Sequence, residues 1–209
     1  LGSFILKKLL DEKTDVVGIK RKESDIQLLD GYHEGINWRE ADILDTYSLE
    51  ESLKGTSVVI HTAASVSFNP RHSKKIHTIN VEGTRNVVNT CLKLGIPRLI
   101  HISSVAALGR QKGITHLNEE SKWIDNALNS DYAESKYLSE LEVFRGQEEG
   151  LSTVIINPSV IVAPADWTKS SAQIFKYVWD SKPFYTTGSL NYVDVRDVAD
   201  MAYSLCSSK

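Results

Sequence analysis

The sequence is poor in the residues that staple small secreted domains together or hold metal ions. Among 209 residues there are only two cysteines, Cys91 and Cys206, which lie far apart in apolar, helix-like surroundings. This pattern predicts buried reduced thiols rather than a disulfide framework, and it favours a cytoplasmic protein. We expect no metal site.

Long apolar runs and an excess of charge are also missing. No run approaches the roughly 18 residues of a membrane-spanning helix, and the N-terminus lacks a signal-peptide pattern. Lysine and arginine number 24 against 27 acidic residues, for a net charge of −3. We therefore expect neither a membrane nor a nucleic acid as partner. The 41% hydrophobic content is that of an ordinary soluble domain with a sizeable core.

What the sequence does contain is an alternation of helical and strand patterns. Several strand-like runs are apolar throughout, as expected of strands that are buried on both faces. The alternation predicts an α/β fold with a doubly wound parallel sheet, the Rossmann arrangement. The expected strands are 15–22, 36–43, 56–64, 98–108 and 152–164, and the expected helices are 3–13, 23–32, 48–55, 72–94 and 130–144. Ser48 and Glu51 form a capping-box pattern that predicts a helix start at Ser48.

The beginning of the chain is unusual for such a fold. Gly2 stands directly before a helix, with no strand ahead of it, whereas a dinucleotide site needs a strand and a glycine-rich turn there. We expect residues 1–209 to be one dinucleotide-binding Rossmann domain that lacks its first strand and its C-terminal substrate part. Parts of the substrate region are expected within about 165–192.

Small residues cluster where three strands end, in "HTAAS" (61–65), "ISSVAA" (102–107) and "NPSV" (157–160). Ligands of doubly wound folds lie beyond these carboxyl ends. Close packing of helix on strand is the alternative explanation for any one of them, but three together favour a pocket.

Basic residues follow the strand expected over 15–22, which corresponds to the second strand of the complete fold. Lys20, Arg21 and Lys22 lie where an adenosine ribose is bound, and basic groups there accommodate the 2′-phosphate of NADP. A solvated basic turn is the alternative, and Glu23 leaves NAD open.

Tyr132 and Lys136 are four residues apart on a predicted helix and therefore share one face. A solvated surface is the bland explanation. The sharper one is a lysine that lowers the pKa of the phenol for proton transfer. Ser104, at a strand end, could supply the second group that holds a substrate oxygen.

Six segments together resemble the extended short-chain dehydrogenase/reductase superfamily, in order and spacing, over essentially the whole chain. They are "HTAA" (61–64), "NVEGT" (80–84), "HISSVAALG" (101–109), "YAESK" (132–136), "NPSVIVAP" (157–164) and "YVDVRDVAD" (192–200). Within the superfamily they look most like the branch of dihydroflavonol reductase, cinnamoyl-CoA reductase and 3β-hydroxysteroid dehydrogenase.

The resemblance implies roles for individual residues. Ser104, Tyr132 and Lys136 match the catalytic residues, and Asn80 matches an asparagine that fixes helix geometry near the site. Cofactor contacts are implied for Gly2, Lys20, Arg21, Asp42, Ile43, Ala63, Ala64, Lys136, Pro158, Ser159 and Val160. One departure is Asn157, which stands where the family usually has an arginine.

These observations predict an NAD(P)-dependent oxidoreductase that moves hydride between nicotinamide and the carbonyl or secondary alcohol of a small molecule. NADP is the expected cofactor, with NAD as the alternative. A nucleotide-sugar epimerase or dehydratase with the same three residues is the second hypothesis, and a non-catalytic NADP-binding sensor or scaffold is the third. A homodimer is compatible with each.

Overall fold

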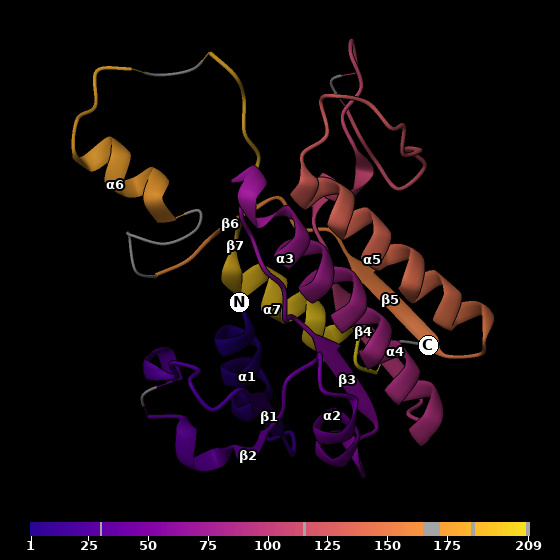
Figure 1. Ribbon diagram of the computed structural model, residues 1–209. Coiled ribbons are helices and arrows are strands. Elements are labelled where there is room, and N and C mark those ends of the chain that lie inside the picture. The colour runs from indigo at the N-terminus through magenta and orange to yellow at the C-terminus, as the bar shows by residue number, and fades with distance from the viewer. Residues whose placement is uncertain (30, 115, 165–171, 185–186, 208–209) are drawn as a thin grey trace.

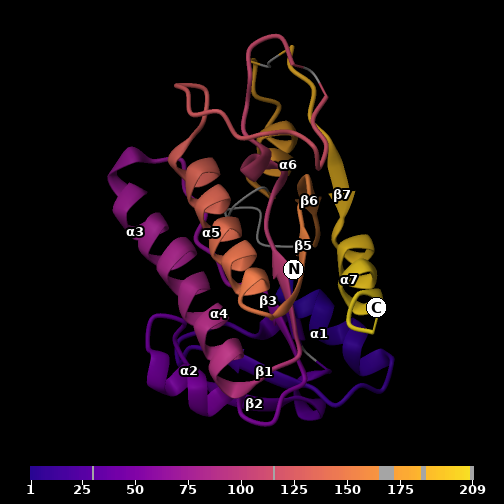
Figure 2. The ribbon, with the colours of Figure 1, turned by 90° about the vertical axis from the view of Figure 1, so that its right-hand side faces the viewer.

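The computed structural model describes residues 1–29, 31–114, 116–164, 172–184 and 187–207. Its helices are α1 (Gly2–Asp11), α2 (Thr46–Leu53), α3 (Ser73–His77), α4 (Gly83–Leu94), α5 (Asp131–Glu148), α6 (Gln173–Trp179) and α7 (Val195–Ser204). Its strands are β1 (Val17–Lys20), β2 (Asn37–Glu40), β3 (Val58–His61), β4 (Arg98–Ile102), β5 (Ser152–Ile156), β6 (Val160–Val162) and β7 (Tyr192–Asp194). Helices cover both faces of the strands (Figures 1 and 2), which confirms the predicted α/β class.

All the strand pairs are parallel, as the predicted fold class requires. Strands β3, β4 and β5 form a three-stranded sheet, and β1 with β2 and β6 with β7 form two-stranded sheets. A doubly wound sheet of order 3-2-1-4-5-6 has its first strand between the positions of β1 and β3. The described residues contain no strand there, and β1 and β3 instead line opposite sides of a cavity of about 850 Å³.

The core consists of two hydrophobic clusters, one on each side of the strands. Successive residues of β4 show the division, because side chains of a strand point alternately to opposite faces. Leu99 packs into a cluster with α2, α4 and α5, whereas Ile100 and Ile102 pack with α1 and α7. On the face of Leu99, two residues further along, lies the fully buried His101.

Local hydrogen bonds moved several boundaries from their predicted places. Helix α2 begins at Thr46 rather than Ser48, because the Asp45 carboxylate caps the N–H groups of Tyr47 and Ser48. The helix expected over 23–32 is reduced to short 3-10 turns. There the Asp25 side chain accepts the N–H of Gln27, a local bond that competes with helix formation.

The helix expected over 72–94 is continuous but not uniform. A π-helical turn, Thr78–Glu82, separates α3 from α4. Such wide turns are frequent at functional sites. This one contains Asn80, which is 1% exposed.

The expected substrate region lies partly outside the described residues, since 165–171 and 185–186 are not among them. Its described part includes α6, which stands apart from the helices packed on the strands (Figure 1). No helix of the described ranges is both long and apolar enough to cross a membrane. The same residues contain no cluster of three or more His, Cys, Asp or Glu side chains placed to hold a metal ion.

Candidate active site

Two elements bring Ser104 and Tyr132 together. Ser104 follows β4, and its hydroxyl oxygen caps the short 3-10 helix Val105–Leu108 by accepting the N–H of Ala106 at 3.2 Å. Tyr132 is the second residue of α5, whose first turn is capped by the Ser130 hydroxyl. The Ser104 hydroxyl lies close enough to the Tyr132 phenol to lower its pKa by a polar interaction. The predicted pair therefore lies at one site, at the carboxyl end of β4.

Burial dominates the acidity of the phenol. It raises the pKa of Tyr132 above its ordinary value, and the nearby Ser104 hydroxyl only partly opposes this effect. The expectation that Lys136 lowers this pKa is wrong for this structure. The Lys136 ammonium donates instead to the main-chain oxygen of Ile102, at 2.9 Å.

Lys136 is itself almost completely buried, with 2% of its surface exposed. Burial lowers its pKa to about 8, and the negative charge of Glu140 partly offsets this. Below that pH the ammonium is mostly charged, held by the end of β4 in a low-dielectric setting. There a positive charge acts more strongly than it does in water.

Two buried histidines lie beneath the lysine. His61 of β3 and His101 of β4 are in register, with ring centroids 5.2 Å apart. Burial, assisted by the charge of Lys136, lowers the pKa of His61 to about 3 and that of His101 well below its ordinary value. His61 Nε2 lies 3.0 Å from the hydroxyl of Thr84. Both rings are thus neutral near pH 7.

Asn80 links the loop after β3 to the start of α5. Its Oδ1 accepts the N–H of Ser65 at 2.7 Å, and its Nδ2 donates to the main-chain oxygen of Ser65 and to the Ser135 hydroxyl. Ser135 in turn donates to the main-chain oxygen of Tyr132 at 2.8 Å. The role in helix geometry that the resemblance implied for Asn80 agrees with these contacts.

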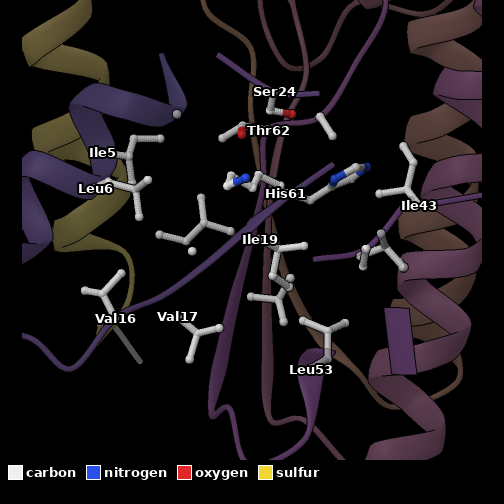
Figure 3. Close-up of a pocket in the computed structure, with 18 of the residues that line it drawn as sticks. Ile5, Leu6, Val16, Val17, Ile19, Ser24, Ile43, Leu53, His61 and Thr62 are labelled. Carbon is white, nitrogen blue, oxygen red and sulfur yellow. The ribbon is translucent and has the colours of Figure 1, made fainter. Parts of the chain in front are cut away.

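Seven of the expected cofactor residues line the cavity between β1 and β3, although they come from separate parts of the chain. Figure 3 shows its interior, where Val17 and Ile19 lie across from His61 and Thr62. The seven are Gly2, Lys20, Arg21, Asp42, Ile43, Ala63 and Ala64.

The N-terminus of α1 fits a dinucleotide. Leu1 provides no side-chain cap, and a Cβ placed on Gly2 would stand 3.1 Å from the Thr62 hydroxyl. A Cβ there would require the Thr62 side chain to shift by a few tenths of an ångström, so glycine favours this close approach between a helix and a strand end. The first-turn amides of such a helix can bind a pyrophosphate.

The basic residues at the end of β1 differ in whether they line the cavity. Lys20 and Arg21 line the cavity, whereas Lys22 and Glu23 are exposed and are not part of its lining. Ser24, which sequence reasoning missed, joins the lining with its hydroxyl (Figure 3).

The remaining expected cofactor residues lie outside that lining. Pro158, Ser159 and Val160 follow β5, and the main-chain oxygen of Pro158 accepts the N–H of Val105 beside Ser104. Pro158 therefore lies beside the Ser104 segment, and Lys136, the fourth of these residues, is on α5. Thr62, which follows His61 at the end of β3, also lines the cavity but was not among the expected cofactor residues. Its strand-end position in "HTAAS" was its only signal in the sequence.

Comparison with known proteins identifies the family. The model of the NAD dependent epimerase/dehydratase family matches residues 1–208. A putative dihydroflavonol 4-reductase of Synechocystis sp. is 30% identical over 95% of this chain and 58% of that protein. Cinnamoyl-CoA reductase 1 of Petunia hybrida is 30% identical over 95% of the chain and 63% of the relative. The chain thus spans about three-fifths of these relatives.

Solved structures agree with the fold. The crystal structure of gox2253 has a TM-score of 0.87 at 30% identity, covering 98% of this chain and 62% of that one. The UDP-glucose 4-epimerase of Thermus thermophilus, in complex with NAD, has a TM-score of 0.81 at 22% identity, covering 100% and 71%.

Proposed function

The chain belongs to the NAD dependent epimerase/dehydratase family, and we propose that it is the cofactor-binding and catalytic part of an NADP-preferring carbonyl reductase. The observation that carries the proposal is the meeting of Ser104 and Tyr132 at one site, with the buried Lys136 on the same helix as Tyr132. The alternative of a sensor without turnover does not need these three groups together.

The chemistry of each residue follows from its surroundings. Bound NADPH would supply the hydride for the carbonyl carbon. Ser104 would hold the carbonyl oxygen by a hydrogen bond, and Tyr132 would give that oxygen its proton. Burial raises the pKa of Tyr132, so the phenol carries a proton near neutral pH, as a donor must. Lys136, whose ammonium donates to the main-chain oxygen of Ile102, would keep a positive charge at this end of β4.

Apolar side chains next to the phenol favour an apolar carbonyl substrate over a nucleotide sugar. Phe68 is 75% exposed, and its ring packs edge-on against Tyr132 with centroids 5.9 Å apart. Val105, directly after Ser104, is 41% exposed. An exposed phenylalanine and valine beside the reacting groups offer contact area to an aromatic or aliphatic substrate and no hydrogen bonds to a sugar.

The test of the reaction is Tyr132→Phe, assayed by NADPH consumption with a panel of aromatic and aliphatic aldehydes and ketones. Since a general acid contributes roughly 10²–10⁴-fold, kcat should fall at least 100-fold while the Kd for NADPH changes less than about twofold. Tyr137→Phe is the matched control. Tyr137 lies on the same helix, stacks on Trp123 and should keep its activity. Turnover by the Tyr132 variant would contradict the acid role, and loss of cofactor binding would indicate a folding role.

The preference for NADP rests on Lys20 and Arg21, which line the cavity at the end of β1. A guanidinium meets a phosphate with two parallel hydrogen bonds, each contributing roughly 1.5–3 kcal/mol. Arg21→Ala should therefore weaken NADPH binding about 10²- to 10⁴-fold and leave NADH nearly unchanged. Lys22→Ala, at an exposed neighbour outside the lining, should leave both affinities within about twofold. Fluorescence titration measures the affinities of the wild type and of both variants for NADPH and for NADH. Equal wild-type affinities for the two cofactors would refute the preference.

A further inference from the structure

Asn157 joins two parts of the proposed site that come from different elements. It follows β5, and its Nδ2 donates to the main-chain oxygen of Ser104 at 3.0 Å and to Oε1 of Glu140 at 2.6 Å. An amide nitrogen carries two hydrogens, so both bonds can form at once. Asn157 thereby ties the Ser104 segment to α5, the helix that carries Tyr132 and Lys136.

The main chain around Ser104 depends on this side chain. The Ser103 N–H donates to the main-chain oxygen of Ile156, the last residue of β5, at 2.8 Å. The Val105 N–H donates to the main-chain oxygen of Pro158, just after β5, at 3.1 Å. The carbonyl of Ser104, between them, points to the Asn157 amide instead. Without that amide the Ser104 carbonyl loses its link to Glu140 of α5.

Glu140 brings a buried negative charge to the same place. It lies one helical turn after Lys136, and the two residues are 7% and 2% exposed. The other titratable groups near Lys136 are His61 and His101, from β3 and β4, and Tyr132 on its own helix. Both histidines are neutral near pH 7 and the phenol is protonated. Among the described groups that act on Lys136, Glu140 alone thus supplies a negative charge.

We propose that Asn157 and Glu140 are positioning residues of this site, an inference that rests on the proposed function. Asn157 sets the Ser104 hydroxyl against Tyr132, and Glu140 keeps Lys136 in its charged form. The carboxylate opposes the effect of burial, which lowers the pKa of the lysine to about 8. Asn157 in turn donates a hydrogen bond to the Glu140 carboxylate. Because this donor is neutral, it leaves the negative charge of Glu140 to act on Lys136.

The role of Glu140 can be tested without turnover, by following the titration of Lys136 with ¹³C NMR of labelled lysine side chains. Glu140→Gln keeps an oxygen for Asn157 but removes the charge, so the midpoint should fall by about one pH unit. Glu142→Gln removes an equal charge two residues further along α5. It bonds to two arginines on the surface of the helices and should leave the midpoint unchanged. An unchanged midpoint in the Glu140 variant, or an equal shift in both, overturns the proposal.

Asn157 is tested by kinetics. Asn157→Ala should lower kcat about 10- to 100-fold, since misplacing a catalytic group by an ångström has effects of that size, with the KM for NADPH within about twofold. Thr153→Ala, which removes one exposed hydrogen bond from β5, should keep full activity. A kcat within twofold of wild type in the Asn157 variant overturns its role. A protein that shows the NMR shift but reduces no carbonyl refutes the proposed function alone, whereas an active protein without the shift refutes this inference alone.

Discussion

Replacing Asn80 by alanine should both destabilise the fold and slow the reaction. The side chain is 1% exposed and makes three hydrogen bonds, two with the main chain of Ser65 and one with the Ser135 hydroxyl. Each contributes about 0.5–1.5 kcal/mol, and partners left unsatisfied in a partly buried place add to the loss. The expected decrease in the free energy of unfolding is about 2–4 kcal/mol. For a domain of this size that lowers Tm by roughly 5–15 °C.

The assay is urea unfolding followed by tryptophan fluorescence, with activity measured at a temperature where the variant is folded. Asn89→Ala is the matched control, because this exposed asparagine accepts a single bond from Arg145. It should stay within about 0.5 kcal/mol of wild type. Asn80→Asp keeps the acceptor for the Ser65 N–H but loses both donors, and should fall between the two.

The effect on the reaction rate follows from a second hydrogen bond, which links the partner of Asn80 to Tyr132. Ser135, which receives one hydrogen bond from Asn80, donates to the main-chain oxygen of Tyr132. We expect kcat to fall about tenfold because the start of α5 loses this support. A loss of stability below about 1 kcal/mol, or one equal to that of Asn89→Ala, would refute the reasoning that these bonds hold the loop after β3 to α5.

Two further predictions concern stability. Gly146→Ala would place a Cβ 2.6 Å from Cγ1 of Val88, which is fully buried and stiff. The clash should lower the free energy of unfolding by about 1–3 kcal/mol, despite the better helix propensity of alanine. In urea unfolding, adding Val88→Ala should relieve part of this loss, and strictly additive effects of the two substitutions would contradict the clash. Because the pKa of His61 is about 3 in the folded state and near 6.5 in the unfolded state, its contribution is complete above pH 6.5 and should be lost as the pH falls toward 3, on the order of 5 kcal/mol in all. His61→Gln should flatten this part of the pH–stability curve measured by urea unfolding, and an unchanged slope would contradict the assignment.

The sequence predicts the meeting of Ser104 and Tyr132 because position along regular elements determines it. One residue follows a buried parallel strand, the other opens a helix over the same edge, and the carboxyl ends of parallel strands share one edge. The same logic placed Gly2, Lys20 and Ala63 in one cavity lining, as the structure has them, and the family resemblance added Asp42.

The direction of the lysine side chain could not be predicted in this way. Helical spacing puts Tyr132 and Lys136 on one face, but an ammonium that enters a buried region goes to the nearest acceptor, here the carbonyl of Ile102. The pKa shifts depend on burial, which a helical pattern does not determine. Glu140 has an ordinary helix position, and Asn157 was noted only for not being arginine, so neither carried a signal of its contact with the other.

The cavity between β1 and β3 carries the same lesson for the fold. Strand β1 pairs with β2 and strand β3 with β4, so within the described residues each has one edge that faces the cavity rather than another strand. Its floor is apolar, with Ile5, Val16 and Leu53 pointing inward (Figure 3). The rim, with its glycine, basic and small residues, has the chemistry of a dinucleotide site. The floor has the chemistry of a sheet interior, so we expect a dinucleotide to occupy only the rim side of this volume.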